Sequence, residues 1–200
     1  MLEQKNRNEF LIIGIGNPWE KYQRTRHNVG AWILDCFAKE NNFPDFIFSE
    51  KFNFLNSEGE LKEKKIILVK PQTFMNDSGQ AVKRIIANYK LKIENFFVIH
   101  DDLDISLGKI KINQNCGSAG HKGVESIIRE LKTKNFIRIR IGIKPENKVL
   151  NDLNIEKFVL KKFDKKEQEI IEQVAKKVEK AIKTILEQGL PHAMNVFNKK

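Results

Sequence analysis

Short runs of apolar residues recur along the chain, and each is ended by turn-forming or polar residues. The clearest are FLIIGI at 10–15, IILV at 66–69 and FFVI at 96–99. Runs of this length, apolar at consecutive positions, are typical of strands that are buried on both faces of a sheet. We therefore expect these three segments to form the central strands of a sheet.

Two other segments alternate apolar and basic residues, namely KIKIN at 109–113 and IRIRIGI at 137–143. Because successive side chains of a strand point to opposite faces, each segment should have one face on the core and its Lys or Arg residues towards solvent or a ligand. Helical periodicity covers about 29–41, 77–90, 120–132 and 164–188. Strands that alternate with such helices predict a single α/β domain with a twisted, mixed and mostly parallel sheet flanked by helices.

The last predicted helix carries an apolar stripe at helical spacing. Its members are Ile170, Ile171, Val174, Val178, Ile182 and Ile185, and Lys and Glu occupy the other face. This pattern favours a helix that packs on the core, and a helix that docks on a partner is the alternative. No internal repeat, linker or second-domain boundary is visible in the sequence.

Charge and cysteine content narrow the class of protein. Lys and Arg number 36 against 26 Asp and Glu, so the formal net charge is +10. A balance this basic favours a polyanionic partner such as nucleic acid, and a lysine-rich compositional bias is the alternative. Cys36 and Cys116 form no CxxC pair, which indicates a reducing cytosol and no structural zinc. Without a secretory signal or an apolar run of about 18 residues, we expect a cytoplasmic protein with no membrane partner.

Polar clusters follow the predicted strands. They read GIGNPWEKYQRTRHNVG at 14–30, KPQTFMNDSG at 70–79, HDDLD at 100–104 and CGSAGHKG at 116–123. Ligands of open α/β sheets bind outside the carboxyl ends of the strands, so these clusters are candidates for one shared site. The first cluster has Trp19 where a dinucleotide fingerprint needs its third glycine, and the next helical pattern begins only at about Val29, which disfavours dinucleotide binding.

The HDDLD cluster is open to several interpretations: a metal site, a cap or turn, or a carboxylate that orients a histidine. A calcium loop that starts at Asp102 would need Gly and Glu where the chain has Leu107 and Asn113. Asp101 and Asp102 should point to opposite sides of a strand. We favour a carboxylate of this cluster that orients a histidine. No Gly-x-Ser-x-Gly motif supplies a serine nucleophile, so the histidine would activate water.

Six motifs, in order and at the expected separations, resemble the bacterial peptidyl-tRNA hydrolase family. They are GIGNPWEKYQRTRHNVG, KPQTFMNDSG, HDDLDISLGKIKI, GHKGVESI, FIRIRIGI and AMNVFN, and the resemblance runs from about Phe10 to Asn198. It implies hydrolysis of the ester between a peptide and the 3′-terminal ribose of tRNA, without a metal or cofactor. It also implies one catalytic domain over 9–198, an extra tail over 1–8, and a monomer.

The resemblance assigns roles to individual residues. His27 matches the general base, Asp101 the carboxylate that holds it, and Asn17 the residue that distinguishes peptidyl from free aminoacyl substrates. The positions implied to bind the tRNA end are Tyr22, Phe74, Met75 and Asn76, with Met75 as an apolar wall, together with Lys111 and Arg140 as a phosphate clamp.

The chain departs from the family pattern at Lys122, where the family usually has asparagine, so an amide that donates and accepts is replaced by a charged donor. We expect Lys122 to face the site and to hold the tRNA end electrostatically, and a side chain that simply extends into solvent is the alternative. The alternative for the whole chain is a non-catalytic RNA-binding relative of the same family. The retained His27, Asp101, Asn17 and Asn76 favour the enzyme.

Overall fold

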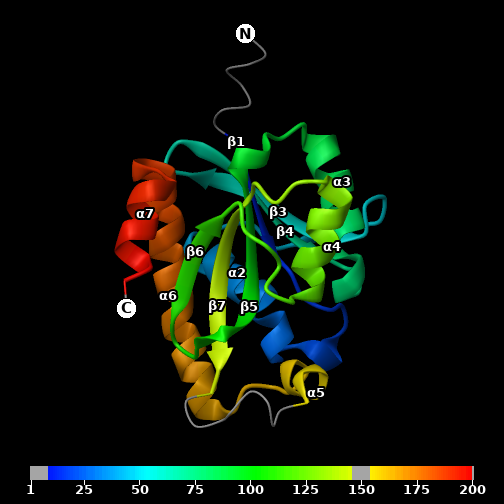
Figure 1. Cartoon of the computed structure of the whole chain (residues 1–200). Coiled ribbons are helices and arrows are strands. Elements are labelled where there is room, and N and C mark those ends of the chain that lie inside the picture. The colour runs from blue at the N-terminus through cyan, green and yellow to red at the C-terminus, as the bar shows by residue number, and fades with distance from the viewer. Residues whose placement is uncertain (1–8, 146–153, 200) are drawn as a thin grey trace.

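The computed structural model describes residues 9–145 and 154–199, and these residues build a seven-stranded sheet with the order β2-β3-β4-β1-β5-β7-β6 (Figure 1). The strands are β1 (Glu9–Gly14), β2 (Ile47–Ser49), β3 (Phe54–Leu61), β4 (Lys64–Pro71), β5 (Phe96–Ser106), β6 (Ile110–Gln114) and β7 (Ile137–Lys144). Strands β4, β1, β5 and β7 are parallel, and antiparallel strands flank them on both sides. The predicted fold class is therefore confirmed.

The three runs predicted as central strands are neighbours in the sheet. They belong to β1, β4 and β5, and β1 pairs in parallel with both of the others. Residues 11–13, 66–69 and 96–99 are all fully buried, with no exposed fraction. Consecutive apolar residues are needed here because helices cover both faces of these strands.

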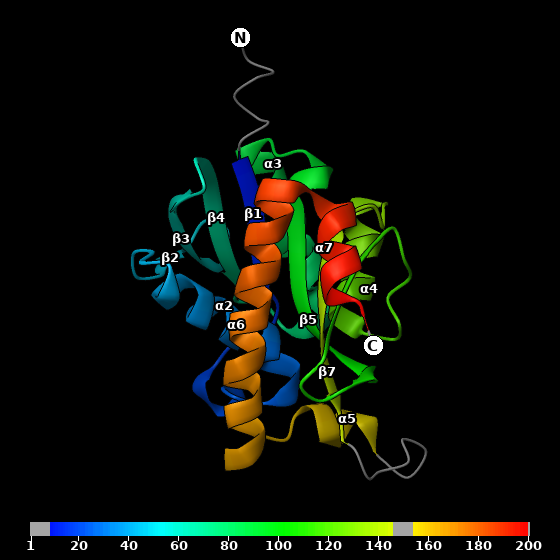
Figure 2. The ribbon, with the colours of Figure 1, turned by 90° about the vertical axis from the view of Figure 1, so that its left-hand side faces the viewer.

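Helices form a layer on each face of the sheet (Figure 2). On one face lie α2 (Val29–Glu40), α6 (Lys165–Gln188) and α7 (Leu190–Phe197), and on the other α3 (Ser78–Tyr89) and α4 (Lys122–Leu131). A short helix, α5 (Ile155–Val159), precedes α6. The four predicted helices are confirmed, and the apolar stripe of α6 is buried in the core except for Ile170, which is partly buried against it.

The hairpin of β3 and β4 was not predicted. Strand β3 reads FLNSEGEL and is only partly buried near the edge of the sheet, so it shows no strict alternation. Its turn residues Lys62 and Glu63 both have positive φ, 54° and 58°. Such a tight turn usually carries Asn or Gly, and without them the sequence gives no hairpin signal.

The prediction that the basic residues of 137–143 face outward is wrong for Arg138. This side chain is 1% exposed and donates from Nη2 to Cys116 Sγ and, over 2.7 Å, to the carbonyl of Gly117. The loop that carries Cys116 and Gly117 covers this face of β7 at Arg138, whereas Arg140, two residues further along the same face, stays partly exposed. Alternation alone does not show which part of a face a loop covers.

Close backbone approaches fix the start of α2 against the sheet. A Cβ atom at Gly14 would lie 2.4 Å from the carbonyl oxygen of Gly30, and one at Gly30 would lie 2.2 Å from that of Ile99. Only glycine permits these contacts, which bring the residues just before α2 to the end of β5. The predicted tail over 1–8 lies outside the described residues.

Candidate active site

The site lies where the parallel strands end. Their carboxyl ends share the edge of the sheet that is at the bottom in Figure 1, next to α5. The loop after β1 carries Asn17 and His27, the loop after β4 carries Met75, and Asp101 is part of β5. The polar clusters of the sequence therefore meet at this edge, as the carboxyl-end rule for open α/β sheets predicts.

His27 is held by Asp101. Its Nδ1 lies 2.9 and 3.0 Å from the two carboxylate oxygens, and the His27 side chain is 12% exposed. When Nδ1 carries the proton that Asp101 accepts, the opposite nitrogen, Nε2, has a lone pair. Within the described residues Nε2 has no hydrogen-bond partner, so it is available to take a proton.

A second histidine binds the same carboxylate. His121 Nε2 lies 2.8 Å from Asp101 Oδ1, and His121 Nδ1 accepts from the backbone N–H groups of Gly123 and Val124 at 3.1 and 3.3 Å. His121 is the N-cap residue of α4. Because Nδ1 accepts two N–H groups it cannot carry a proton, so Nε2 carries it and donates to Asp101.

Asp101 stays ionised in this setting. It is 2% exposed, and burial by itself would raise the pKa of its carboxyl. The His27 and His121 rings outweigh burial and hold the pKa well below its ordinary value. The carboxylate can therefore stabilise positive charge that develops on His27.

His100 supports Asp101 from the core. Its Nδ1 donates over 2.7 Å to the backbone carbonyl of Asp101, and its ring is fully buried with its centroid 4.8 Å from that of His121. Burial, followed by the nearby His121 and Arg138, lowers the pKa of His100 well below its usual value. His100 is thus a neutral structural residue.

Asn17 presents an amide N–H group to the site. Its Oδ1 accepts from the backbone N–H of Met75 at 2.9 Å, and within the described residues its Nδ2 has no partner. The side chain of Asn28 brackets the backbone of Asn17, since it accepts from Asn17 N at 2.9 Å and donates to Asn17 O at 2.8 Å. The Asn28 contacts hold the backbone of Asn17, and the Met75 contact fixes which end of its side-chain amide faces outward.

Aromatic residues lie beside Asn17. The Trp19 ring packs edge-on against Phe74 at a centroid distance of 4.9 Å and is 6.3 Å from the Tyr22 ring. Met75, which precedes Asn76 in the same loop, has a buried side chain 4% exposed, so it packs beneath the site through its side chain and contacts Asn17 through its backbone. The Asn76 side chain is exposed.

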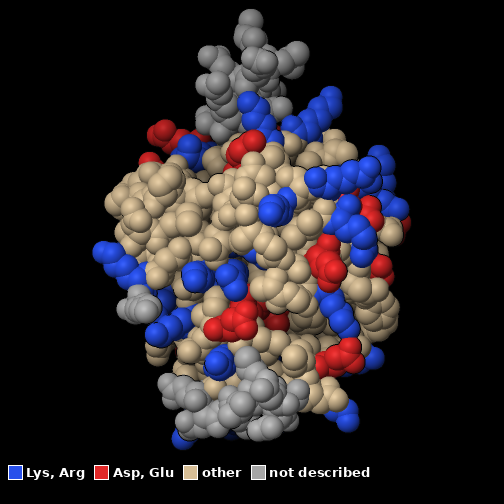
Figure 3. All heavy atoms as spheres, in the orientation of Figure 1, with Lys and Arg blue, Asp and Glu red and all other residues tan. Residues whose placement is uncertain are grey.

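The predicted phosphate-binding residues lie on neighbouring strands. Lys111 on β6 is exposed and pairs in register with Arg140 on β7. Arg140 Nε donates to Asp102 Oδ2 over 2.6 Å, and its Nη1 to Asn113 Oδ1 over 3.2 Å. In the space-filling view, basic side chains gather in front of β6 and β7, with acidic ones directly below them (Figure 3).

Lys122 follows His121 at the start of α4 and points to α5. Its ammonium donates over 2.6 Å to Glu156, and the two side chains are 63% and 77% exposed. The ammonium lowers the pKa of the Glu156 carboxyl. The residue where the chain departs from the family pattern is thus at the rim of the site, in an ion pair open to water.

A metal ion could contact only one cluster among the residues that the structure describes, His27, Asp101 and His121, whose ligand atoms lie within 4.8 Å of one another. Both rings already point these atoms at the carboxylate at hydrogen-bond distance. His121 Nε2 carries a proton, as its Nδ1 contacts require, so it is not a metal ligand. Asp101 and Asp102 point to different partners, His27 and Arg140, as the strand alternation predicts.

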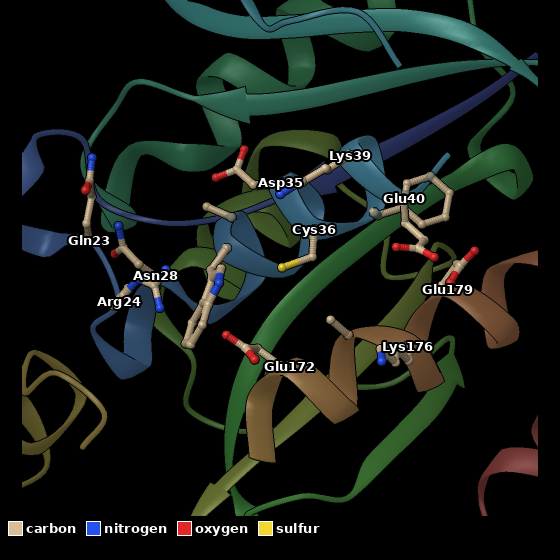
Figure 4. Close-up of a pocket in the computed structure, with 14 residues that line it drawn as sticks. Gln23, Arg24, Asn28, Asp35, Cys36, Lys39, Glu40, Glu172, Lys176 and Glu179 are labelled. Atoms are coloured by element: carbon tan, nitrogen blue, oxygen red, sulfur yellow. The ribbon is translucent and has the colours of Figure 1, made fainter. Parts of the chain in front are cut away.

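A separate pocket lies between α2 and α6 (Figure 4). It has a volume of about 680 Å³, and its lining includes Trp32, Cys36 and Glu172. Asn28 also lines it, but His27, Asp101 and Asn17 do not. The pocket therefore does not contain the histidine–carboxylate cluster.

Sequence reasoning missed three residues of the site. His121 was visible only as a histidine before a predicted helix, Asn28 as the residue after His27, and Trp19 as a break in a glycine pattern. The structure marks Trp19, because its φ of 78° and ψ of 147° form a conformation that glycine adopts readily and other residues rarely do. Such a conformation costs roughly 1–3 kcal/mol and is concentrated at functional sites.

Fold and site together define a class: an α/β enzyme with a carboxylate-held histidine suited to general-base chemistry. A family model described as peptidyl-tRNA hydrolase matches residues 11–200. A peptidyl-tRNA hydrolase of Thermoanaerobacter sp. (strain X514) is 43% identical over 94% of this chain and 99% of its own length. One of Clostridium tetani (strain Massachusetts / E88) is 39% identical over 94% and 97%.

A crystal structure of peptidyl-tRNA hydrolase from Acinetobacter baumannii superimposes with a TM-score of 0.87 at 30% identity, covering 96% of this chain and 95% of that one. The chain therefore belongs to the peptidyl-tRNA hydrolase family. This membership confirms the family resemblance of the six motifs. No helix in residues 9–145 and 154–199 is long and apolar enough to cross a membrane.

Proposed function

We propose that the chain hydrolyses the ester between a peptide and the 3′-terminal ribose of tRNA, and releases the peptide and a tRNA that can be charged again. Family membership supports the reaction. The observation that carries the mechanism is the contact of His27 Nδ1 with Asp101, which leaves His27 Nε2 as a base. The substrate is a polyanion, in keeping with the net charge of +10.

The nucleophile in this mechanism is water. His27 Nε2 takes a proton from water as the oxygen attacks the ester carbonyl, and the imidazolium returns the proton to the ribose oxygen as it leaves. Asp101 stabilises the imidazolium, and the N–H of His121 keeps the carboxylate oriented. No covalent intermediate and no cofactor is needed.

Asn17 supplies selectivity for peptidyl substrates. Its outward group is the Nδ2 donor, because Met75 occupies Oδ1. A peptide offers a carbonyl oxygen that can accept from Nδ2, whereas a free α-ammonium has donors only and carries charge. A substrate with a blocked amino group should therefore bind productively and a free aminoacyl-tRNA should not.

The tRNA end would contact Tyr22, Phe74 and Asn76 at the rim. Lys111 and Arg140 would bind a phosphate further along the acceptor stem. We also propose that the protein acts as a monomer in the cytoplasm, where translation produces the substrate. Its two cysteines are free thiols, as a reducing compartment requires.

The test is release of the blocked amino acid from N-acetyl-aminoacyl-tRNA, measured with and without a chelator, beside the free aminoacyl-tRNA. We expect fast release from the acetylated substrate alone, unchanged by the chelator. No release from the acetylated substrate would overturn the proposed reaction. Loss of activity in the chelator would overturn the metal-free mechanism.

A further inference from the structure

Trp19 has two features that a structural role does not explain. Its ring is 58% exposed, and its backbone has a φ of 78° with a ψ of 147°, a combination that residues with a side chain rarely adopt. Burial of apolar area would stabilise the fold, but most of this indole stays in water. A large aromatic side chain held outward at a strained position indicates a role in binding.

The rings of Trp19, Tyr22 and Phe74 form one group, which we call the aromatic cluster. Trp19 meets Phe74 at an interplanar angle of 85° and Tyr22 at 23°. Phe74 is itself 43% exposed. The cluster therefore presents open ring surface to solvent on two different loops.

The aromatic cluster is fixed next to the reaction centre. Trp19 is two residues after Asn17, and Phe74 immediately precedes Met75. The hydrogen bond of 2.9 Å from Met75 N to Asn17 Oδ1 ties the two loops together. A ligand on the Trp19 ring would thus lie beside the Asn17 amide that faces the substrate.

A cation accompanies the rings. Lys21 Nζ lies 5.1 Å from the centroid of the Trp19 ring and 5.0 Å from that of Tyr22. Among the residues that the structure describes, Lys21 has no carboxylate partner. Aromatic faces combined with an unpaired cation match a nucleotide, which has a flat base and a phosphate. A peptide side chain would use the rings and not the cation.

We propose that Trp19 stacks on a nucleobase at the 3′ end of tRNA and that Lys21 binds an adjoining phosphate. This inference rests on the proposed function, in which the tRNA end enters this site. The stack acts on binding and positioning of the tRNA end, and the proton transfer belongs to His27. Trp19 is therefore a further binding residue, beyond those that the family resemblance assigns.

Kinetics of Trp19→Gly test the proposal, because glycine removes the ring and relieves the backbone strain. We expect KM for N-acetyl-aminoacyl-tRNA to rise about 5- to 10-fold, the lower range for one base stack on an open face. At saturation kcat should stay unchanged, and the melting temperature should not fall. Trp32→Phe, in the pocket between α2 and α6, is the matched control and should change neither constant. An unchanged KM in Trp19→Gly would overturn the proposal.

Fluorescence separates the base from other ligands. The chain has two tryptophans, so Trp32→Phe leaves Trp19 as the only tryptophan emitter. A single-stranded oligonucleotide that ends in CCA should quench this emission to saturation. An abasic oligomer of equal charge, and an N-acetylated phenylalanine peptide amide, should not. Quenching by the peptide alone, or equal quenching by the abasic oligomer, would overturn the stacking assignment.

Adding His27→Ala to the Trp32→Phe protein distinguishes this proposal from the catalytic one. Quenching by the oligonucleotide should remain while hydrolysis is lost. If hydrolysis instead persists in His27→Ala, the proposed mechanism fails. The stacking proposal is then still decided by the quenching of Trp19 emission. If quenching disappears with His27→Ala, the aromatic cluster does not bind the oligonucleotide independently of His27, which would contradict the proposal.

Discussion

At the scale of the residue, the site depends on which atom of each side chain is already occupied. His27 uses Nδ1 on Asp101, His121 uses both ring nitrogens, and Asn17 uses Oδ1 on Met75. The groups left over are one lone pair on His27 Nε2 and the NH₂ group of Asn17. The lone pair can take a proton from water, and the NH₂ group can donate to a substrate oxygen.

Asp101→Asn is expected to lower kcat by roughly 10²–10⁴, because an amide cannot stabilise the imidazolium and holds the ring less well. The pH–rate profile should also change, because the ring of His27 then faces a neutral amide in place of a carboxylate. The measurement is kcat/KM as a function of pH. A profile that matches the wild type would mean that Asp101 does not hold His27.

The same variant has a stability readout. The pKa of Asp101 is depressed in the fold, so its hydrogen bonds with His27 and His121 stabilise the protein above the ordinary carboxyl pKa, and this stability is lost as the pH falls through the folded-state value. We expect acid unfolding of the wild type to lose this contribution progressively below about pH 4, and Asp101→Asn to lack that part of the slope. Equal slopes would contradict the depressed pKa.

Asn17→Asp keeps an oxygen for the Met75 N–H but removes the Nδ2 donor. We expect kcat/KM for N-acetyl-aminoacyl-tRNA to fall by about 10- to 100-fold, because one buried hydrogen bond is lost and the new carboxylate oxygen repels the peptide carbonyl oxygen. Preference over free aminoacyl-tRNA should shrink. Asn195→Asp, an exposed position on α7, adds the same charge elsewhere and should have no effect. If both variants behave alike, Asn17 does not contact the peptide.

The placement of His27, Asp101 and Asn17 at one edge of the sheet could be predicted from the sequence because their motifs follow apolar runs, and their roles stay a prediction. His121 could not, because its role depends on the N–H groups of Gly123 and Val124 that fix its tautomer, and these exist only once α4 begins at that point. A histidine in a glycine-rich loop has no sequence mark of that kind.

At the scale of the element, the parts that the sequence predicted are those with strong periodicity. Three buried strands and four helices were found because burial on two faces, or on one helix face, dictates the pattern. Strands β2 and β3, at and next to one edge of the sheet, were missed because they are partly exposed and have a weak pattern. At the other edge of the sheet, Asn198 hydrogen-bonds to the backbone of β6. Its Nδ2 donates to Ile112 O over 2.9 Å, and its Oδ1 accepts from Ile112 N at 2.7 Å.

The junction of α4 and α5 yields a prediction about Lys122. Because its ammonium is shared with Glu156, Glu156→Gln should free it for the tRNA and lower KM about two- to five-fold at low salt, in the range of exposed charge pairs. Lys122→Glu should raise KM by repulsion, and Lys122→Asn should keep kcat and lose part of the salt dependence. KM is measured at low and moderate salt. Identical low-salt values in all variants would exclude Lys122 from the site.

At the scale of the whole molecule, the sign of the net charge follows from the sequence, but the distribution of the charged side chains does not. A net charge of +10 predicted a polyanion, and basic side chains do lie over β6 and β7. It did not predict that Arg138 is buried or that Arg140 is tied to Asp102. Those contacts depend on the order of the strands, which alternation alone cannot specify.

If the β6–β7 surface binds phosphate, tRNA affinity should fall with salt, and Arg140→Ala should flatten the plot of log K against log salt by about one unit. Lys111→Ala should flatten the plot in the same way. Unlike Arg140→Ala, it leaves the contact between Arg140 and Asp102 intact. Arg84→Ala, exposed on α3, is the control and should keep the wild-type slope. Slopes that do not change in either β-strand variant would show that this surface does not bind phosphate.

The central claim is that His27 is the base of the reaction. The direct test is single-turnover hydrolysis of N-acetyl-aminoacyl-tRNA by His27→Ala, with the dissociation constant for tRNA measured on the same preparation. The account predicts a rate lower by about 10²–10⁴ and an affinity within about two-fold of the wild type, as for loss of a general base alone. A rate close to that of the wild type, with tRNA still bound, would contradict it.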